Sequence, residues 1–212
     1  MTSDRSAVFL LDVANDIAVD AEICDGITEQ QLVDWEAGWV PELHGALRRL
    51  RDANVARQYW PQSRHWDWRK KTLTLQKFLT AQGFSVTCRG MTEGMMVVDS
   101  AMHRCRAHEQ LGQHLVYVDY LETAPWNRKE LLFYPPRYRG VGSILMRAAV
   151  ELSLQEGFKG RIALHSLPQA HDWYAKKCVM TTLGVDPNKE NLHYFEMTSA
   201  QADAFIGTGN VT

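Results

Sequence analysis

A run of arginines and glycines directly before an apolar segment with helical spacing is the part of the chain best suited to chemistry. It reads Arg137-Tyr138-Arg139-Gly140-Val141-Gly142-Ser143. The first turn of a helix carries backbone N–H groups without an internal partner, and the helix dipole adds about half a positive charge there. Glycine has no Cβ, so an anion can approach its backbone closely. The run predicts an anion cradle suited to a pyrophosphate, and a simple turn before a helix is the alternative.

Two common phosphate-binding loops do not fit this run. A P-loop requires a lysine directly after its second glycine, and none follows Gly142. A dinucleotide fingerprint requires a third glycine and a preceding parallel strand, whereas the strands expected before this run are antiparallel. Neither nucleotide-binding class is therefore expected.

The elements that must position the cradle follow from hydrophobic periodicity and turn residues. Helices are expected at 27–56, with a Thr28–Gln31 capping box and a bend or break at Pro41, and at 72–84, ending at Gly83. Further elements are strands at 7–14, 84–90, 93–100, 114–125, 160–168 and 192–198, a hairpin turn at 91–94, helices at 141–157 and 169–178, and a frayed tail. This order predicts a single domain over 1–212 of the α/β class (α+β type), with a mixed, mostly antiparallel central sheet flanked by helices.

The run and its context resemble the acetyl-coenzyme A (acetyl-CoA) binding motif of the GNAT family, the Gcn5-related N-acetyltransferases. That motif is Arg or Gln, two residues, Gly, one residue, then Gly or Ala, and residues 137–142 satisfy it between a strand and a long helix. Downstream, Ala170, Trp173 and Tyr174 are similar to the family's A-x-x-F-Y segment, although its closing Gly-Phe is missing. The resemblance covers 84–198, the expected acetyl-CoA core, and leaves 1–83 to shape the acceptor side.

Donor-binding residues are implied by this resemblance, position by position. Strand 114–125 would bind the pantetheine arm and polarise the thioester through its backbone at about Leu121 to Thr123. The pyrophosphate would meet the backbone amides of Arg139, Gly140, Val141, Gly142 and Ser143, with Arg137 as a neighbouring charge.

Catalytic residues are implied in the same way. Tyr174 takes the place of the family's general acid, because a phenol can donate to the departing sulfur without being ionised at neutral pH. Asp119 and Glu122 are the candidate bases, but they have opposite parity on a regular strand, so only a bulge would turn them to one side. Deprotonation of the amine through water, without a dedicated base, is the alternative.

The acceptor side is less clearly indicated. The insertion at 125–136 lengthens the loop before the cradle and is expected to cover the active site or shape the acceptor pocket. His65, Trp66, Asp67 and Trp68 would suit a cationic amine, or form an aromatic core segment with Asp67 as a helix N-cap. His165 is expected to be structural.

Composition restricts the partners. The 212 residues carry a formal net charge of -2, which gives no overall attraction to nucleic acid or to anionic membranes. No apolar run approaches the roughly 20 residues of a membrane span. Four scattered cysteines indicate reduced thiols and a cytoplasmic protein. His103, Cys105 and His108 lack a fourth ligand, so no metal is expected.

The leading function is thus an acetyl-CoA-dependent N-acetyltransferase that acts by direct attack in a ternary complex. Its acceptor would be an amine of a small molecule, a peptide or protein, or, less readily, an aminoacyl-tRNA. The alternative is a non-catalytic GNAT-fold sensor or regulatory module that binds acyl-CoA. Strand 192–198 is apolar enough to pair two copies as a homodimer.

Overall fold

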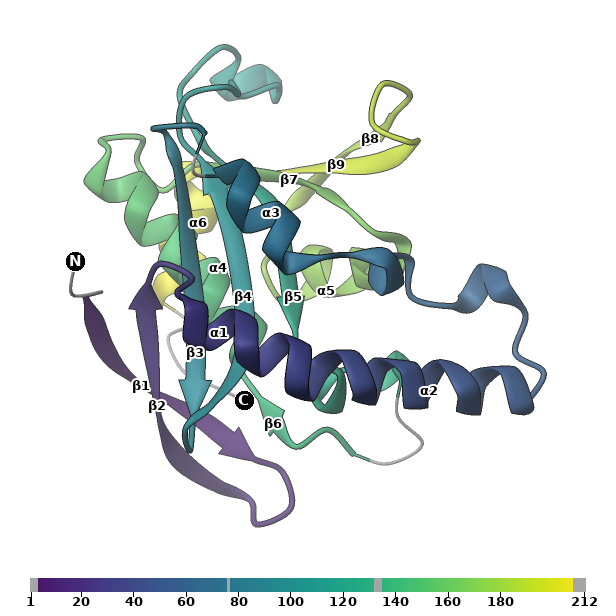
Figure 1. The fold of residues 1–212 in the computed structure, drawn as a ribbon. Helices are drawn as coiled ribbons and strands as arrows, with labels where there is room; N and C mark the ends of the chain where they lie inside the picture. Colours follow the sequence, from purple (N-terminus) through teal and green to yellow (C-terminus); the bar gives the residue numbers. More distant parts are fainter. Residues whose placement is uncertain (1–3, 76, 132–134, 208–212) are drawn as a thin grey trace.

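The computed structural model describes residues 4–75, 77–131 and 135–207. Within them, nine strands form one sheet in the order β6-β1-β2-β3-β4-β5-β7-β9-β8, and only β5 and β7 are parallel neighbours (Figure 1). The strands are β1 (Arg5–Asp12), β2 (Ile17–Asp25), β3 (Ala81–Cys88), β4 (Met91–Asp99), β5 (Val116–Thr123), β6 (Tyr138–Arg139), β7 (Ile162–Ser166), β8 (Thr181–Asp186) and β9 (Leu192–Met197). The predicted fold class is confirmed.

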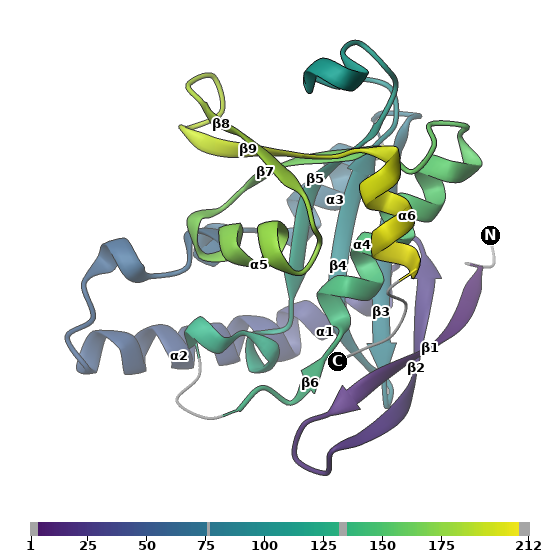
Figure 2. The ribbon, with the colours of Figure 1, turned by 180° about the vertical axis from the view of Figure 1, so that it is seen from behind.

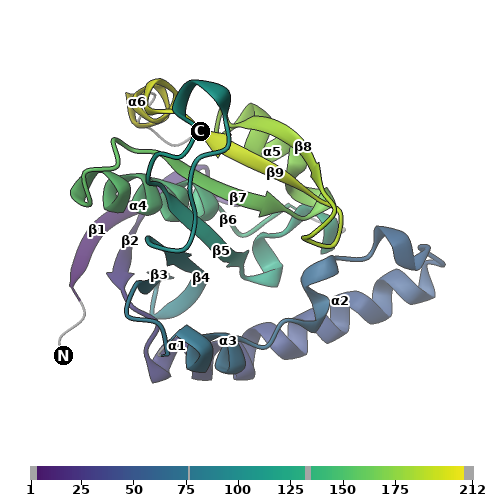
Figure 3. The ribbon, with the colours of Figure 1, turned by 90° about the horizontal axis from the view of Figure 1, so that it is seen from above.

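Helices cover both faces of this sheet (Figures 2 and 3). One face carries α1 (Glu29–Asp34), α2 (Val40–Asp52) and α3 (Trp68–Leu75), and the other carries α4 (Val141–Gln155), α5 (His171–Lys176) and α6 (Ser199–Gly207). Central strand β4 is therefore buried on both sides: Met96 and Val98 join the core under α4, while Met95 and Val97 pack with Trp68 on the opposite face. No helix in the described ranges is long and apolar enough to cross a membrane.

The first helical region begins as predicted but changes its geometry at a different place. The capping box is present, and the Thr28 N–H donates to Gln31 Oε1 at 2.9 Å. The helix continues through Pro41, and Trp35–Trp39 forms a π-helical turn in which the Val40 N–H bonds to the Trp35 carbonyl. Proline lacks an N–H and crowds the carbonyl four residues before it. A wider turn just upstream relieves that crowding, so the expected break at Pro41 is wrong.

The helix expected at 72–84 is also wrong in both of its limits. Helix α3 begins at Trp68, where Asp67 Oδ1 accepts the Lys70 N–H at 3.0 Å as an N-cap. Gly83 lies within β3 and pairs with Val97. A Cβ on Gly83 would be 3.1 Å from a side-chain carbon of Ile27. This glycine permits close strand packing and does not end a helix.

The hairpin turn between β3 and β4 lies earlier than expected. Arg89 and Gly90 form it with φ angles of 49° and 76°, so Met91–Gly94 belongs to β4 and not to the turn. Strands β2, β6 and β8 were not predicted, and α6 occupies part of the tail that was expected to be frayed. Strand β9 is paired on both sides, by β7 and β8, so it offers no free edge to a second copy.

A bulge in β5 sets the direction of its side chains. Val98 pairs with Val118 and Val97 with Tyr120, so Asp119 is the extra residue. Beyond it, Leu121 contacts the core under α4, while Tyr120 packs against the opposite core. The parity argument that separated Asp119 from Glu122 therefore does not hold for this strand.

Candidate functional site

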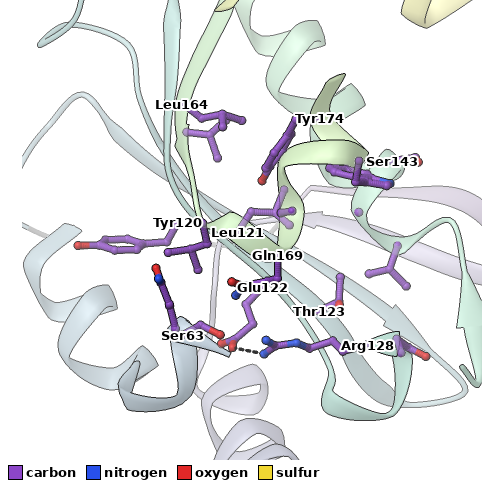
Figure 4. Close-up of a pocket in the computed structure, with 18 of the residues that line it drawn as sticks. Ser63, Tyr120, Leu121, Glu122, Thr123, Arg128, Ser143, Leu164, Gln169 and Tyr174 are labelled. Atoms are coloured by element: carbon purple, nitrogen blue, oxygen red, sulfur yellow. Dashed lines mark hydrogen bonds and ion pairs between the residues drawn. The ribbon is translucent and has the colours of Figure 1, made fainter. Parts of the chain in front are cut away.

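A cleft of about 1370 Å³ opens where β5 and β7 separate. The two strands pair only between Val116–Val118 and Ile162–Leu164, so β5 continues past the bulge without β7 beside it. The start of α4 and helix α5 line one part of the cleft, and segments 62–71 and 127–130 line another. Figure 4 shows Leu121 between the two parts, with Ser143 and Tyr174 on one side of it and Ser63 and Tyr120 on the other.

The predicted anion cradle lies at the start of α4, on the wall of this cleft. Gly140 is the N-cap with φ of 100°, a left-handed conformation that favours glycine. The first helical bond joins the Ile144 N–H to the Gly140 carbonyl, so the amides of Val141, Gly142 and Ser143 precede the helix's own ladder. These residues and Arg139 line the cleft. The geometry is that of an open helix N-terminus, which suits phosphate oxygens.

Arg137 does not share this wall. Its guanidinium lies 4.7 Å from the ring centroid of Trp126. Its backbone pairs twice: the N–H with the Trp126 carbonyl at 2.9 Å, and the carbonyl with the Val13 N–H at 3.0 Å. Arg137 holds the strand that enters the cradle, and of these two arginines only Arg139 lines the cleft.

Gly142 is constrained by packing as well as by the cradle. A Cβ at this position would lie 3.1 and 3.2 Å from two ring carbons of Trp173. The indole of Trp173 thus covers the first turn of α4. A larger residue at Gly142 would displace Trp173 before it met any ligand, so a substitution here cannot separate ligand repulsion from misfit.

Tyr174 lies where the predicted general acid should lie. It is buried among the residues under α4, yet it lines the cleft, and Figure 4 shows its side chain pointing into it. Burial raises the pKa of the phenol, so it stays protonated at neutral pH. A protonated phenol beside the cleft can donate a hydrogen bond or its proton to a leaving group.

Glu122 lines the cleft but is already engaged on both carboxylate oxygens. Arg128 Nη1 lies 2.8 Å from Oε1, and the Trp68 indole N–H donates to Oε2 at 2.7 Å. Both members of the ion pair are buried (Figure 4). A carboxylate whose two oxygens are both engaged by other side chains serves to fix the wall of the site.

Asp119 is the more accessible of the two carboxylates. It lies at the β5 bulge, exposed to solvent in the cleft but with protein around it on several sides. That partial desolvation, reinforced by the negative charge of Asp99, raises the pKa of Asp119 to about 6. The group is therefore ionised at neutral pH and basic enough to accept a proton.

The inserted segment 125–136 is hydrogen-bonded to the sheet. Its residues 132–134 lie outside the described residues. Glu93 Oε2 accepts two hydrogen bonds of 2.7 Å from this segment, one from Trp126 and one from Asn127. The Asn127 side chain also accepts the Tyr138 N–H at 2.9 Å. The insertion thus connects β4 to the cradle and delivers Arg128 to Glu122.

His165 belongs to a polar chain at the far end of the cleft. One ring nitrogen contacts the Tyr117 hydroxyl, and the other lies 3.0 Å from Asp186 Oδ2. Asp186 in turn accepts a hydrogen bond of 2.6 Å from Arg106. Burial lowers the pKa of His165, so a neutral ring bridges Tyr117 and Asp186. These hydrogen bonds support the expectation that His165 is structural, although His165 and Tyr117 also line the cleft.

Lys71 is a cleft residue that the sequence analysis missed. Its Nζ lies 3.1 Å from the ring centroid of Tyr120 and 4.4 Å from that of Trp66. Burial lowers its pKa to about 8, although three carboxylates, Glu122, Asp119 and Asp67, act in the opposite direction. The three-residue spacing from Trp68 placed it on the buried face of α3. That spacing was the signal available in the sequence.

No group of three or more His, Cys, Asp or Glu side chains suitable for a metal is present in the described part of the chain. The four cysteines are buried free thiols.

Comparison with known proteins identifies the fold. The sequence matches no family model and no curated protein. Among solved structures, Mycobacterium smegmatis RimJ in complex with CoA-disulfide aligns with a TM-score of 0.51, 13% identity, and coverage of 99% of this chain and 98% of that one. The PaiA N-acetyltransferase from Thermoplasma acidophilum in complex with coenzyme A aligns with a TM-score of 0.51, 10% identity, and coverage of 83% and 97%.

The chain has the GNAT fold. An uncharacterised protein from Bacillus halodurans is similar as well, with a TM-score of 0.52, 12% identity, and coverage of 95% and 97%. At these identities the likeness concerns the fold, and the chemistry must be argued from the residues of this chain.

Proposed function

We propose that the protein is an acetyl-CoA-dependent N-acetyltransferase. The observation that carries the proposal is the convergence of three features on one cleft: the open N-terminus of α4, the hydroxyl of Tyr174 and the carboxylate of Asp119. Amide donors for an anion, a neutral acid and an accessible base are the groups that acyl transfer to an amine requires.

The residues present fit the donor. The amides of Val141, Gly142 and Ser143, with Arg139 beside them, would hold the pyrophosphate. The backbone of Leu121 to Thr123, no longer paired to β7, would hold the pantetheine arm. Bound acetyl-CoA supplies an activated acetyl group, and residues of this chain bind the substrates and transfer the protons.

The chemical roles follow from the protonation states. Asp119, ionised at neutral pH, removes a proton from the acceptor ammonium directly or through water. The neutral amine forms the new N–C bond as the C–S bond of the thioester breaks. Tyr174, kept protonated by burial, donates to the departing sulfur. Glu122 and Arg128 hold the wall that positions the acceptor.

The alternative, a module that binds acyl-CoA without catalysis, leaves two features without a role. A sensor needs the cradle, but it needs neither a protonated Tyr174 facing the cleft nor a basic Asp119 across from it. These two residues are why we favour an enzyme.

Calorimetric titration with acetyl-CoA and with CoA tests the donor site. The informative variant is Ser143→Asp, because Ser143 is exposed in the first turn of α4, where a carboxylate stabilises the helix. We expect micromolar binding by the wild type and at least a tenfold loss, about 1.4 kcal/mol, from repulsion of the pyrophosphate.

Gln155→Asp is the matched control. It adds the same charge to α4 twelve residues later, about 18 Å away along the axis, and should leave the affinity unchanged. Release of CoA thiol in the presence of a panel of amines then tests catalysis. Absence of acetyl-CoA binding by the folded wild type would contradict the proposal.

A further inference from the structure

Helix α3 directs the amine of Lys71 into the cleft, toward the carboxylates of β5. Asp67 caps the helix, and Trp68, fully buried, anchors it through its hydrogen bond to Glu122. Residues three apart lie on one face of a helix, so Lys71 follows Trp68 toward β5. The aromatic contacts confirm this direction, and Lys71 lines the cleft wall with Tyr120 and Leu121.

The amine of Lys71 lies between two aromatic rings. Trp66 and Tyr120 meet edge to face with centroids 5.3 Å apart, and Nζ lies against both. This arrangement holds the amine over the β5 segment that begins at the bulge. The next residue of that segment is Leu121, where the proposed function places the thioester.

The charge state of this amine differs from that of an ordinary surface lysine. Asp67, Asp119 and Glu122 all favour the ammonium, but burial outweighs them and brings the pKa to about 8. About a quarter of the amine is then neutral at pH 7.5, compared with about one part in a thousand for an unperturbed lysine. The cleft therefore already contains a nucleophile of the kind that its acceptor must present.

We propose that Lys71 is itself an acetyl acceptor, a self-modification site within the cleft. This inference rests on the proposed function for its donor. The Nζ lone pair attacks the thioester carbonyl carbon of acetyl-CoA, the N–C bond forms and the C–S bond breaks. The amine nitrogen loses one proton and the departing sulfur gains one, so the products are acetyl-Lys71 and CoA.

Acetylation would remove the cation from between Trp66 and Tyr120 and leave a neutral amide on the acceptor side of β5. The reaction would stop after one turnover per chain, since the amide is no longer nucleophilic. An external amine that binds the same region would compete with it.

Mass spectrometry of the wild-type protein incubated with acetyl-CoA tests the inference. We expect one added acetyl group per chain, on Lys71, formed at least tenfold faster than acetylation of Lys70. Lys70 is the matched internal control: it is the adjacent residue and also borders the cleft, but its side chain is 84% exposed and pairs with Asp67. This comparison needs no variant, so it does not depend on a substituted protein that folds.

Three variants sharpen the test. Lys71→Arg, which keeps the charge but is not nucleophilic, should abolish the single fast modification, while Lys70→Arg should leave it in place. Ser143→Asp should slow acetylation of Lys71 at subsaturating acetyl-CoA, but not that of Lys70. Equal rates at Lys70 and Lys71 would remove the selectivity that the inference requires, and a Lys71 rate indifferent to Ser143→Asp would mean uncatalysed chemistry. Either result would overturn the inference.

Failure of the inference and failure of the proposed function give different results. If calorimetry shows acetyl-CoA binding and external amines are acetylated while Lys71 stays unmodified, the self-modification is refuted and the enzyme stands. If the folded wild type does not bind acetyl-CoA, the proposed function fails, and the acceptor role of Lys71 fails with it.

Discussion

Replacing Arg128 by methionine is expected to lower the free energy of unfolding by about 3–5 kcal/mol at pH 7. The guanidinium is the only cation that the described structure places in contact with the buried Glu122 carboxylate. Methionine would leave that charge with the Trp68 N–H alone. The other partner of Arg128, Glu130, is about one-third exposed, so that pair contributes less than about 1 kcal/mol.

The magnitude corresponds to two to four orders of magnitude in the unfolding equilibrium constant, since about 1.4 kcal/mol is a factor of ten. Urea titration followed by tryptophan fluorescence would measure it, because seven tryptophans report on the fold. Arg147→Met is the matched control. Its ion pair with Glu151 lies on the surface of α4, with both side chains about half exposed, and its loss should cost less than about 1 kcal/mol.

The double variant Glu122→Gln/Arg128→Met separates an unpaired charge from lost packing. A neutral amide can still accept the Trp68 N–H and needs no cation, so the double variant should regain most of the stability lost by Arg128→Met. The reasoning is refuted if Arg128→Met costs no more than Arg147→Met. It is equally refuted if neutralising Glu122 restores nothing.

Three further outcomes are expected. The kcat/KM of acetyl transfer should rise with pH through about 6 as Asp119 loses its proton. Asp119→Asn should remove this rise, and an unchanged pH profile in the variant would exclude Asp119 as the base. Tyr174→Phe should reduce kcat by about 10²–10⁴-fold and leave the CoA dissociation constant within twofold, whereas a sensor would lose nothing. Burial raises the pKa of Glu93 to about 7, so the native state binds its proton more tightly than the unfolded state and stability should fall, by on the order of 3 kcal/mol, as pH rises from 4.5 to 7. Glu93→Gln should reduce this fall in urea titrations at each pH, and an identical slope would contradict the assignment.

The sequence was most informative where the determinants are local. Three such features each depend on residues only a few positions apart: the glycines and arginines of the cradle, the apolar periodicity of α4, and the adjacent pair Trp173 and Tyr174. The start of helix α4 directly after this run was predicted correctly for this reason. The roles assigned to its residues, and the division into an acceptor part (1–83) and a donor core (84–198), stay predictions.

Features that depend on partners distant in the sequence were not predictable in the same way. Whether Asp119 shares a side with Glu122 depends on a bulge, and the bulge exists only in the register between β4 and β5. The engagement of Glu122 depends on Arg128 from the insertion and on Trp68 from α3, neither of which its own strand reveals. From the sequence alone both carboxylates were candidate bases, and Glu122 was the one nearer the expected carbonyl.

Some elements were missed although a weak signal was present. Thr198 and Gln201 exchange hydrogen bonds as a capping box, and the T-x-x-Q spelling indicates the start of α6. Strand β8 is short, largely exposed and interrupted by Gly184, so its pattern carries little information. In β2, Val19, Ala21 and Ile23 alternate with the exposed acidic residues Asp20 and Glu22, so a short period-two signal was present.

The pairing of β1 with β6 has a consequence for synthesis of the chain. Leu11 pairs with Arg139, 128 residues later, so the outer edge of β1 has no strand partner until most of the protein has been made. At about 5–20 residues per second, that interval is roughly 6–26 s. Throughout it, the nascent hairpin of β1 and β2 presents an open edge, with Phe9 and Ile17 more than half exposed even in the finished fold. Ribosome-bound chaperones that cover the first 25 residues should therefore raise the yield of folded protein. The strand that finally pairs with that edge, at Leu11 and Asp12, is the one that enters the cradle.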